Sequence, residues 1–136
     1  MPKYADVIML ALAAVLVAGC QSGIPKSAQR RTSAEMRQAI GTDGLTAWGH
    51  DTKGNDWVSY TAPNGTVVVK SGTFTDQGAW HIDPGGKFCL KWHKIRNGAE
   101  TCMTQYVAGN DIYNVLPDGS VVSVQTRQAP GNPDHL

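Results

Sequence analysis

Three residues in the segment 78–107 have side chains that could bind a metal ion. His81 and Asp83 lie two positions apart in an alternating segment, and His93 lies in the segment that follows. Side chains two apart in a strand share a face, and zinc accepts both imidazole and carboxylate ligands. Their spacing matches no compact zinc motif, and polar residues on the wet face of a sheet account for them better. We therefore expect no metal and no other cofactor.

A second polar group flanks a loop at His50, Asp51 and Asp56. An imidazole beside carboxylates could supply a general acid and base, but Asp and Asn are also common in turns because their side chains bond the local backbone. The sequence contains no Gly-x-Ser-x-Gly segment for a nucleophile. It also has no glycine-rich phosphate loop ahead of a helix. These observations predict a protein that is not an enzyme.

Aromatic side chains form the third candidate set. They could line the mouth of a barrel and bind an apolar molecule or a sugar. The more common alternative is that they form the core of a small β domain, in which each ring buries a large area. The candidates for ligand binding are Trp48, Trp57, Trp80, Trp92 and Tyr106.

The first residues of the chain have the pattern of an export signal. Lys3 precedes an apolar run over residues 7–17, which is too short to span a bilayer and has the length of a signal-peptide core. The run ends in Val17-Ala18-Gly19-Cys20, which resembles the lipobox of bacterial lipoproteins. The resemblance implies that residues 1–19 are removed and that Cys20 is lipidated. The alternative is an ordinary cleaved signal with an incidental cysteine.

This resemblance also implies a location. Acyl chains on Cys20 would hold the protein on a membrane of the cell envelope, facing the periplasm. Gln21 stands where an aspartate would favour the inner membrane in enteric-type bacteria, so we expect the outer membrane. Residues 20–31 are polar and lack periodicity, which predicts a flexible tether in which Arg30 and Arg31 are solvated.

The predicted lipid anchor determines how many cysteines are left to form a disulfide. With Cys20 lipidated, Cys89 and Cys102 remain, and two cysteines in an oxidising compartment are usually paired. A two-residue turn at Asn97-Gly98 would place Cys89 opposite Tyr106, too far from Cys102 for a bond. A disulfide therefore requires a longer loop, with Gly98 in the unusual backbone conformation. The alternative is two buried free thiols.

The elements that would position these residues are mainly strands. Residues 32–40 predict one short helix, with Thr32 and Glu35 at capping-box spacing and Gly41 at its end. From Leu45 to Arg127, alternating segments are separated by turn residues every 8 to 12 positions. The pattern predicts a mainly β fold, an antiparallel meander of 7–8 strands that forms a curved sheet or a small barrel. The domain would span residues 32–127, followed by a loose tail over residues 128–136.

The order of several motifs resembles a family of small exported proteobacterial proteins that share a domain of unknown function. The family pattern is a T-x-x-E-h-R helix, A-P-x-G-T, G-x-W-x-h-D, G-k-h-C-h-x-W and a second cysteine with a following tyrosine. The matching segments here are Thr32–Arg37, Tyr60–Thr66, Gly78–Asp83, Gly86–Trp92 and Cys102–Tyr106. Met103 departs from the aromatic residue expected after the second cysteine. The resemblance implies no activity and no catalytic residues.

Two classes of function remain open. The first is a non-catalytic envelope lipoprotein that binds a protein, a lipid or a glycan. The second is an inhibitor of a periplasmic enzyme such as a lysozyme or protease, in which residues 51–56 or 117–120 would enter the partner's cleft. The chain loosely resembles the small-barrel lipoproteins that bind such enzymes, although it contains no inhibitor motif. The net charge of +1 gives no electrostatic basis for binding nucleic acid.

Overall fold

The structure is a computed structural model, which describes residues 23–136. The predicted signal peptide and Cys20 lie outside the described residues. The helical elements are α1 (Ser33–Ile40) and the 3₁₀ turn η1 (Ile95–Gly98). The strands are β1 (Gln29–Arg30), β2 (Leu45–Asp51), β3 (Asp56–Thr61), β4 (Thr66–Ser71), β5 (Phe74–Ile82), β6 (Phe88–Trp92), β7 (Thr101–Ala108), β8 (Asp111–Val115) and β9 (Val121–Pro130).

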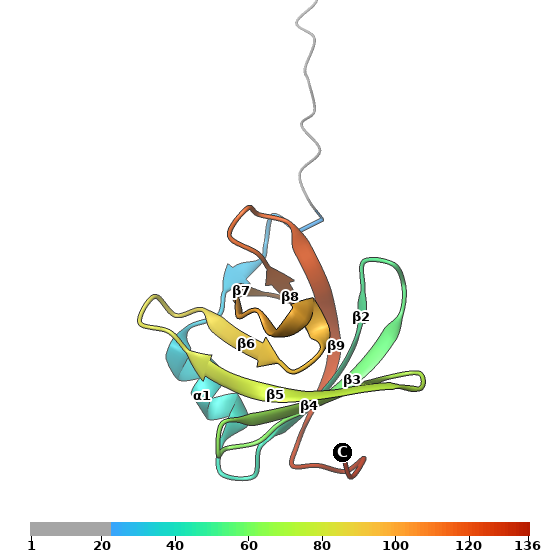
Figure 1. Cartoon of the computed structure of the whole chain (residues 1–136). Coiled ribbons are helices and arrows are strands. Elements are labelled where there is room, and N and C mark those ends of the chain that lie inside the picture. The colour runs from blue at the N-terminus through green and yellow to red at the C-terminus, as the bar shows by residue number, and fades with distance from the viewer. Residues whose placement is uncertain (1–22) are drawn as a thin grey trace, which may run out of the picture.

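Strands β2 to β9 form a closed antiparallel barrel of eight strands (Figure 1). Each strand pairs with the next along the chain, and β9 returns to pair with β2 and close the ring. The extra strand β1 pairs with β7 beyond the point where β6 stops, at Gln29↔Val107 and Arg30↔Tyr106. The prediction of a mainly β meander with one short helix is confirmed, and the sheet is closed rather than open.

Because every barrel strand reverses direction, the connections gather at two ends. The α1 end holds α1 and the turns at residues 62–65, 83–87 and 109–110. The η1 end holds the turns at residues 52–55, 72–73 and 116–120 and the loop of residues 93–100. In Figure 1, η1 crosses in front of the ring of strands. No helix among residues 23–136 is long and apolar enough to cross a membrane.

Helix α1 begins and ends as the sequence predicts. The Thr32 hydroxyl accepts a hydrogen bond from Glu35 N at 3.1 Å and donates one to Glu35 Oε1 at 3.0 Å. The Gly41 N–H bonds the Arg37 carbonyl at the other end. The apolar face of the helix buries Met36 and Ile40 against Phe88. An eight-residue helix is marginal alone, so this contact with the barrel stabilises it.

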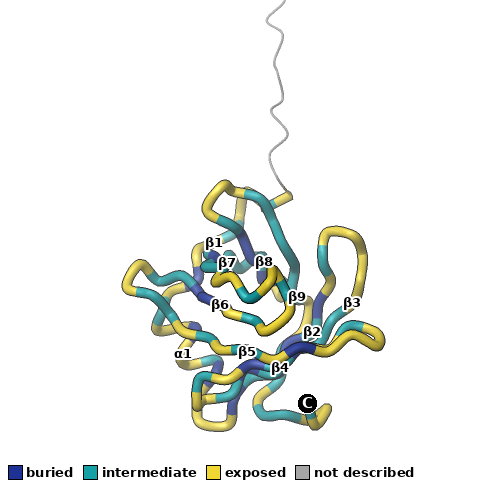
Figure 2. The backbone as a smooth tube through the Cα atoms, in the orientation of Figure 1, coloured by how far each residue is buried: buried dark blue, intermediate teal, exposed yellow. Residues whose placement is uncertain are grey.

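The inner face of the barrel carries the predicted alternation. Phe88 and Leu90 of β6 point inward, and Trp80 of β5 stacks on Phe88 with ring centroids 5.8 Å apart. Val67 and Val69 of β4 are buried, while Lys70 in the same strand points to the other face and is exposed. Figure 2 shows the buried positions recurring along the strands, with the connections exposed. The hydrophobic core therefore lies inside the barrel and against α1.

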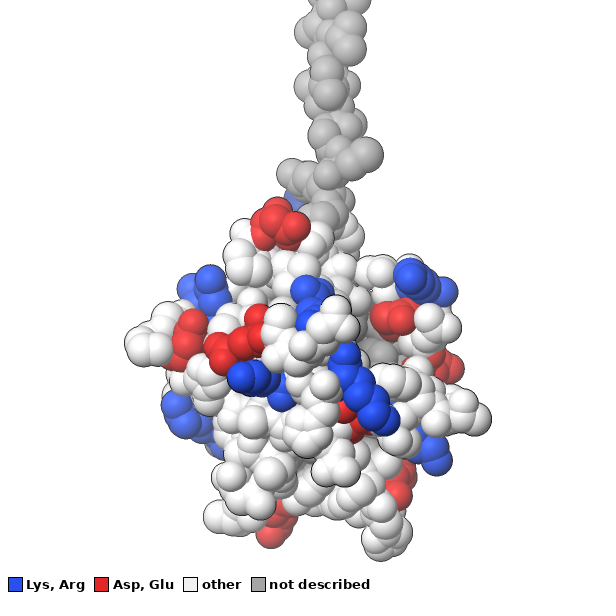
Figure 3. Space-filling model, in the orientation of Figure 1, with Lys and Arg blue, Asp and Glu red and all other residues white. Residues whose placement is uncertain are grey.

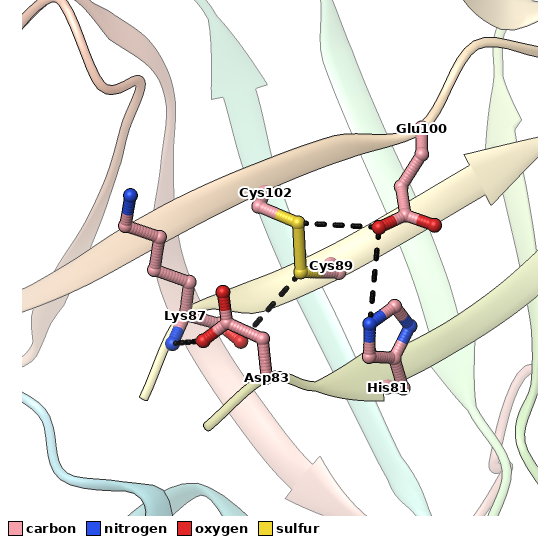
Figure 4. Close-up of a disulfide and its surroundings, with 6 residues drawn as sticks. All are labelled: His81, Asp83, Lys87, Cys89, Glu100 and Cys102. Atoms are coloured by element: carbon pink, nitrogen blue, oxygen red, sulfur yellow. Dashed lines mark hydrogen bonds and ion pairs between the residues drawn. A yellow bond between two sulfur atoms is a disulfide. The ribbon is translucent and has the colours of Figure 1, made fainter. Parts of the chain in front are cut away.

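The β6–β7 hairpin has the longer of the two loops considered above. Cys89 pairs directly with Cys102 across the strands, and the two sulfurs form a disulfide with an S–S distance of 2.03 Å. The connecting loop contains η1, and Gly98 adopts a φ of 78° as expected. Arg96 and Asn97 also have positive φ, at 54° and 53°. The tight Asn97-Gly98 turn is therefore wrong, and the disulfide is confirmed (Figure 4).

Two predicted boundaries are wrong. The segment expected to be a tether contains β1 at its end, and Arg31 is only 8% exposed instead of solvated. Its backbone N–H bonds the Gln105 carbonyl, which continues the pairing of β1 with β7. At the other terminus, β9 extends to Pro130 because β2 offers it partners as far as Leu45. The residues after β9 are also bonded, since Thr46 Oγ1 donates to the Gly131 carbonyl at 2.6 Å.

Candidate functional site: an apolar cavity inside the barrel

A cavity of about 450 Å³ lies inside the barrel. Met36 and Ile40 of α1 bound it at one end, and Ile95 and Arg96 of the η1 loop bound it at the other. Most of the lining surface between them is apolar. Cavities of 300 to 1,000 Å³ with mainly apolar walls and a few polar groups are typical of small-molecule sites. This cavity is therefore the candidate functional site.

The five predicted aromatic residues are distributed over the inside and the outside of the barrel. Trp57 and Trp92 line the cavity. Trp80 belongs to the core near the α1 end, where its Nε1 donates to the Ala62 carbonyl at 2.7 Å. Trp48 and Tyr106 do not line the cavity. The structure therefore brings only two of the five together at this site.

Trp48 lies on the outer wall of the barrel. Its ring faces the Arg127 guanidinium at 3.7 Å, and its Nε1 donates to Asp134 Oδ2 at 3.1 Å. These contacts hold the C-terminal residues against β2, so the side chain has a structural explanation. Tyr106 alternates with the inward-facing Gln105 on β7 and therefore lies on the outer face as well.

A row of polar side chains crosses the cavity wall over β7, β8 and β9. Arg31 Nη1 donates to Gln105 Oε1 at 3.1 Å, Gln105 Nε2 to Asn114 Oδ1 at 3.1 Å, and Asn114 Nδ2 to Ser123 Oγ at 2.9 Å. All four residues line the cavity. Gln105 and Asn114 are 3% and 4% exposed, so the row is a buried network inside an apolar space. We call it the polar row.

Sequence reasoning missed the polar row. Gln105 and Asn114 occupy inward positions of strands that were predicted correctly, in the same alternation as Met103 and Ile112. A polar residue in phase with apolar neighbours was the available signal. Arg31 gave no such signal, because it stands in a polar segment and its burial depends on the pairing of β1 with β7.

A buried carboxylate holds the η1 loop. Asp76 is 3% exposed, and its carboxylate accepts amide hydrogen bonds from Ile95 at 2.8 Å, Lys94 at 3.0 Å and Gln77 at 2.8 Å. Burial acts to raise the pKa of Asp76, but the three amide bonds outweigh it and lower the pKa below its ordinary value. The ionised side chain therefore fixes the loop that covers this end of the cavity. Asp76 lies near the start of β5 at an inward position, and the sequence analysis did not single it out.

His81 and Asp83, two of the three residues considered for a metal site, have local structural partners. His81 Nε2 lies 3.8 Å from Glu100 Oε1, beside the disulfide, and Asp83 Oδ1 accepts the Lys87 N–H at 2.8 Å (Figure 4). Two groups of three metal-ligand types occur here, but each includes a disulfide-bonded cysteine, which has no thiolate to offer. His93 is exposed at the start of the η1 loop.

Asp51 forms the predicted turn. Its carboxylate accepts hydrogen bonds from the backbone of Lys53 and from the backbone and side chain of Asn55. The Asn55 side-chain bond is the main reason that the pKa of Asp51 is lowered. An acid with a lowered pKa is a poor proton carrier near neutral pH. The interpretation of residues 50–56 as a turn therefore fits the geometry better than an acid and base pair.

Comparison of the chain with known proteins gives no matching family model, no similar curated protein and no similar solved structure.

Proposed function

We propose that this protein is a non-catalytic lipoprotein of the bacterial cell envelope that binds a small apolar ligand inside its barrel. The observation that carries the proposal is the cavity of about 450 Å³ with its mainly apolar wall. Water interacts weakly with such an apolar wall. The binding free energy of a ligand that buries apolar surface there is more favourable by about 25 cal/mol for each Å² removed from water. Charges of both signs are spread over the face seen in Figure 3, which gives no preference for a highly charged partner.

The cellular location in this proposal rests on the sequence. The lipobox at Cys20 supports lipid anchoring, and Gln21 supports the outer membrane, with the barrel facing the periplasm. The Cys89–Cys102 disulfide suits an oxidising compartment. Intact mass of the protein extracted from membranes tests the anchor. We expect loss of residues 1–19 and acyl chains on Cys20, whereas an unmodified cysteine would contradict the anchor.

Filling the cavity tests the binding function. Ser59 of β3 lines the cavity, and its neighbour Val58 does not. We expect Ser59→Phe to reduce binding of the neutral fluorescent probe N-phenyl-1-naphthylamine by tenfold or more, because the ring would occupy the space that the probe needs. Val58→Phe is the matched control, with the same ring on the other face of the same strand. Equal probe binding by both variants would contradict a ligand site inside the barrel.

A further inference from the structure

The polar row begins at a buried charge. Arg31 is 8% exposed, and it lines the cavity together with Met36, Ile40 and Gln105, the residue that its guanidinium bonds. Its backbone is already fixed to β7 by the hydrogen bond from Arg31 N to the Gln105 carbonyl at 2.8 Å. The pairing of this segment with β7 therefore does not depend on the charged side chain of Arg31.

The charge is incompletely compensated. Within residues 23–136, no carboxylate lies within 4.0 Å of the Arg31 guanidinium, and its one side-chain partner is the neutral Gln105. A guanidinium has five N–H donors, and this bond uses one of them. Burial lowers the pKa of Arg31, and Glu35 acts only at longer range in the opposite direction. Burying a charge is costly unless it is paired, so the site is suited to an anion.

The surroundings define the kind of anion. The cavity extends from Arg31 past Phe88 and Leu90 toward Trp57 and Trp92, a largely apolar path. A fully hydrated inorganic anion would leave this path unused, and an uncharged hydrocarbon would leave the guanidinium unpaired. A carboxylate matches the planar guanidinium with two parallel hydrogen bonds.

We propose that the ligand of the cavity is a single-chain carboxylate amphiphile, whose head binds Arg31 and whose hydrocarbon chain extends toward Trp57 and Trp92. This inference rests on the proposed function. It adds the chemical class of the ligand, its orientation and the residue that selects its head.

The test compares two ligands with the same chain. The full chain, reconstituted in liposomes, is titrated with dodecanoate and with dodecanol below their aggregation concentrations. Binding is measured in excess of that to protein-free liposomes. We expect dodecanoate to bind about tenfold more tightly than dodecanol, a difference of about 1.4 kcal/mol, because a hydrogen bond to a charged group is stronger than one between neutral groups. Without a cation to pair it, the carboxylate would be the poorer ligand because of its desolvation cost.

Two arginine variants locate the head. Arg31→Gln retains a donor for Gln105 but removes the charge, so we expect it to lose the preference for dodecanoate and to keep its affinity for dodecanol. Arg96 lines the cavity at the η1 end, so Arg96→Gln tests the opposite orientation of the ligand. Arg37, at an exposed position of α1, does not line the cavity, so Arg37→Gln is the control and should leave the preference unchanged. Retained dodecanol binding also shows that the variant barrel is intact.

Each other outcome overturns a defined part of the account. If the unaltered protein binds dodecanol as tightly as dodecanoate, the anionic head is wrong although the apolar site stands, and this result does not depend on any variant folding. If only Arg96→Gln removes the preference, the head binds at the η1 end and the orientation is wrong. If neither ligand binds, the proposed function itself fails.

Discussion

The two ends of the barrel are covered in different ways. At the α1 end, Met36 and Ile40 pack against Phe88, and the contact is entirely apolar. At the η1 end, the covering loop is held by amide hydrogen bonds from Lys94 and Ile95 to the Asp76 carboxylate. One end therefore depends on hydrophobic packing, which is insensitive to pH, and the other on a titratable group.

This difference suggests a division of roles. The α1 end contains the packed core and Arg31, where the polar row begins, so it forms a fixed floor for the cavity. The η1 end is a loop over residues 93–100 whose attachment is concentrated in one side chain, and these residues are mostly exposed. A small number of polar contacts can be exchanged more easily than a packed apolar surface. We therefore expect ligands to enter at the η1 end.

The largest effect on stability should come from the α1 end. Met36 is 2% exposed, so Met36→Ala would leave a cavity under the helix and cost about 2–5 kcal/mol of unfolding free energy. Gln38→Ala, at an exposed position of the same helix, is the control and should change stability by less than about 0.5 kcal/mol. Denaturant unfolding measures both. A similar small change in the two variants would mean that α1 does not close the barrel by packing.

A smaller effect is expected at the η1 end. Asp76→Asn removes the charge that strengthens three amide hydrogen bonds and should cost about 1–3 kcal/mol. Amide hydrogen exchange should increase at Lys94 and Ile95 more than in α1. Asp118→Asn is a matched control, because Asp118 also has a lowered pKa but is exposed in a turn. An equal loss in the two variants would argue against a special role for the buried carboxylate.

The pH dependence should separate the two ends further. The pKa of Asp76 is lowered in the folded protein, so its contribution is complete above the ordinary aspartate pKa and is lost as the pH falls toward the lowered value. Unfolding measured as a function of pH should therefore show acid destabilisation that is weaker in Asp76→Asn. Met36→Ala should retain the whole dependence. An identical acid response in Asp76→Asn would exclude this carboxylate as a source.

The smallest predicted effect is at the start of α1. Thr32→Ala removes the cap that bonds Glu35 N and should cost about 1 kcal/mol. Thr32→Ser should restore most of the stability, since serine caps helices as well as threonine does. Thermal unfolding of the two variants tests this. Failure of serine to restore stability would show that the threonine methyl group matters more than the hydrogen bond.

Local patterns predicted the parts of the fold that local physics controls. Thr32, Glu35 and Gly41 mark the ends of α1 because capping depends on residues within one turn. Alternation and turn residues located the barrel strands for the same reason. The disulfide was predicted from the cysteine count and from the expectation of an oxidising compartment. Its direct Cys89↔Cys102 register in the structure then excluded the tight turn.

The site was harder to predict because it depends on contacts between distant segments. Arg31 and Gln105 are 74 positions apart, and only the closed barrel with its extra strand brings them together. The same closure separates the tryptophans, since Trp57 faces inward and Trp48 faces outward from the neighbouring strand. Residue type identified these aromatics as candidates, but only the register of β2 and β3 decides which of them can reach a ligand.

The central claim is that the ligand binds inside the barrel, and the four tryptophan side chains test it most directly. Their indole N–H signals can be followed by NMR while dodecanoate is added to the full chain. The account predicts that the signals of Trp57 and Trp92, which line the cavity, shift in parallel with saturation, while that of Trp48, bonded to Asp134 on the outer wall, does not. A shift of Trp48 with Trp57 and Trp92 unchanged would place the ligand on the outer surface and contradict the account.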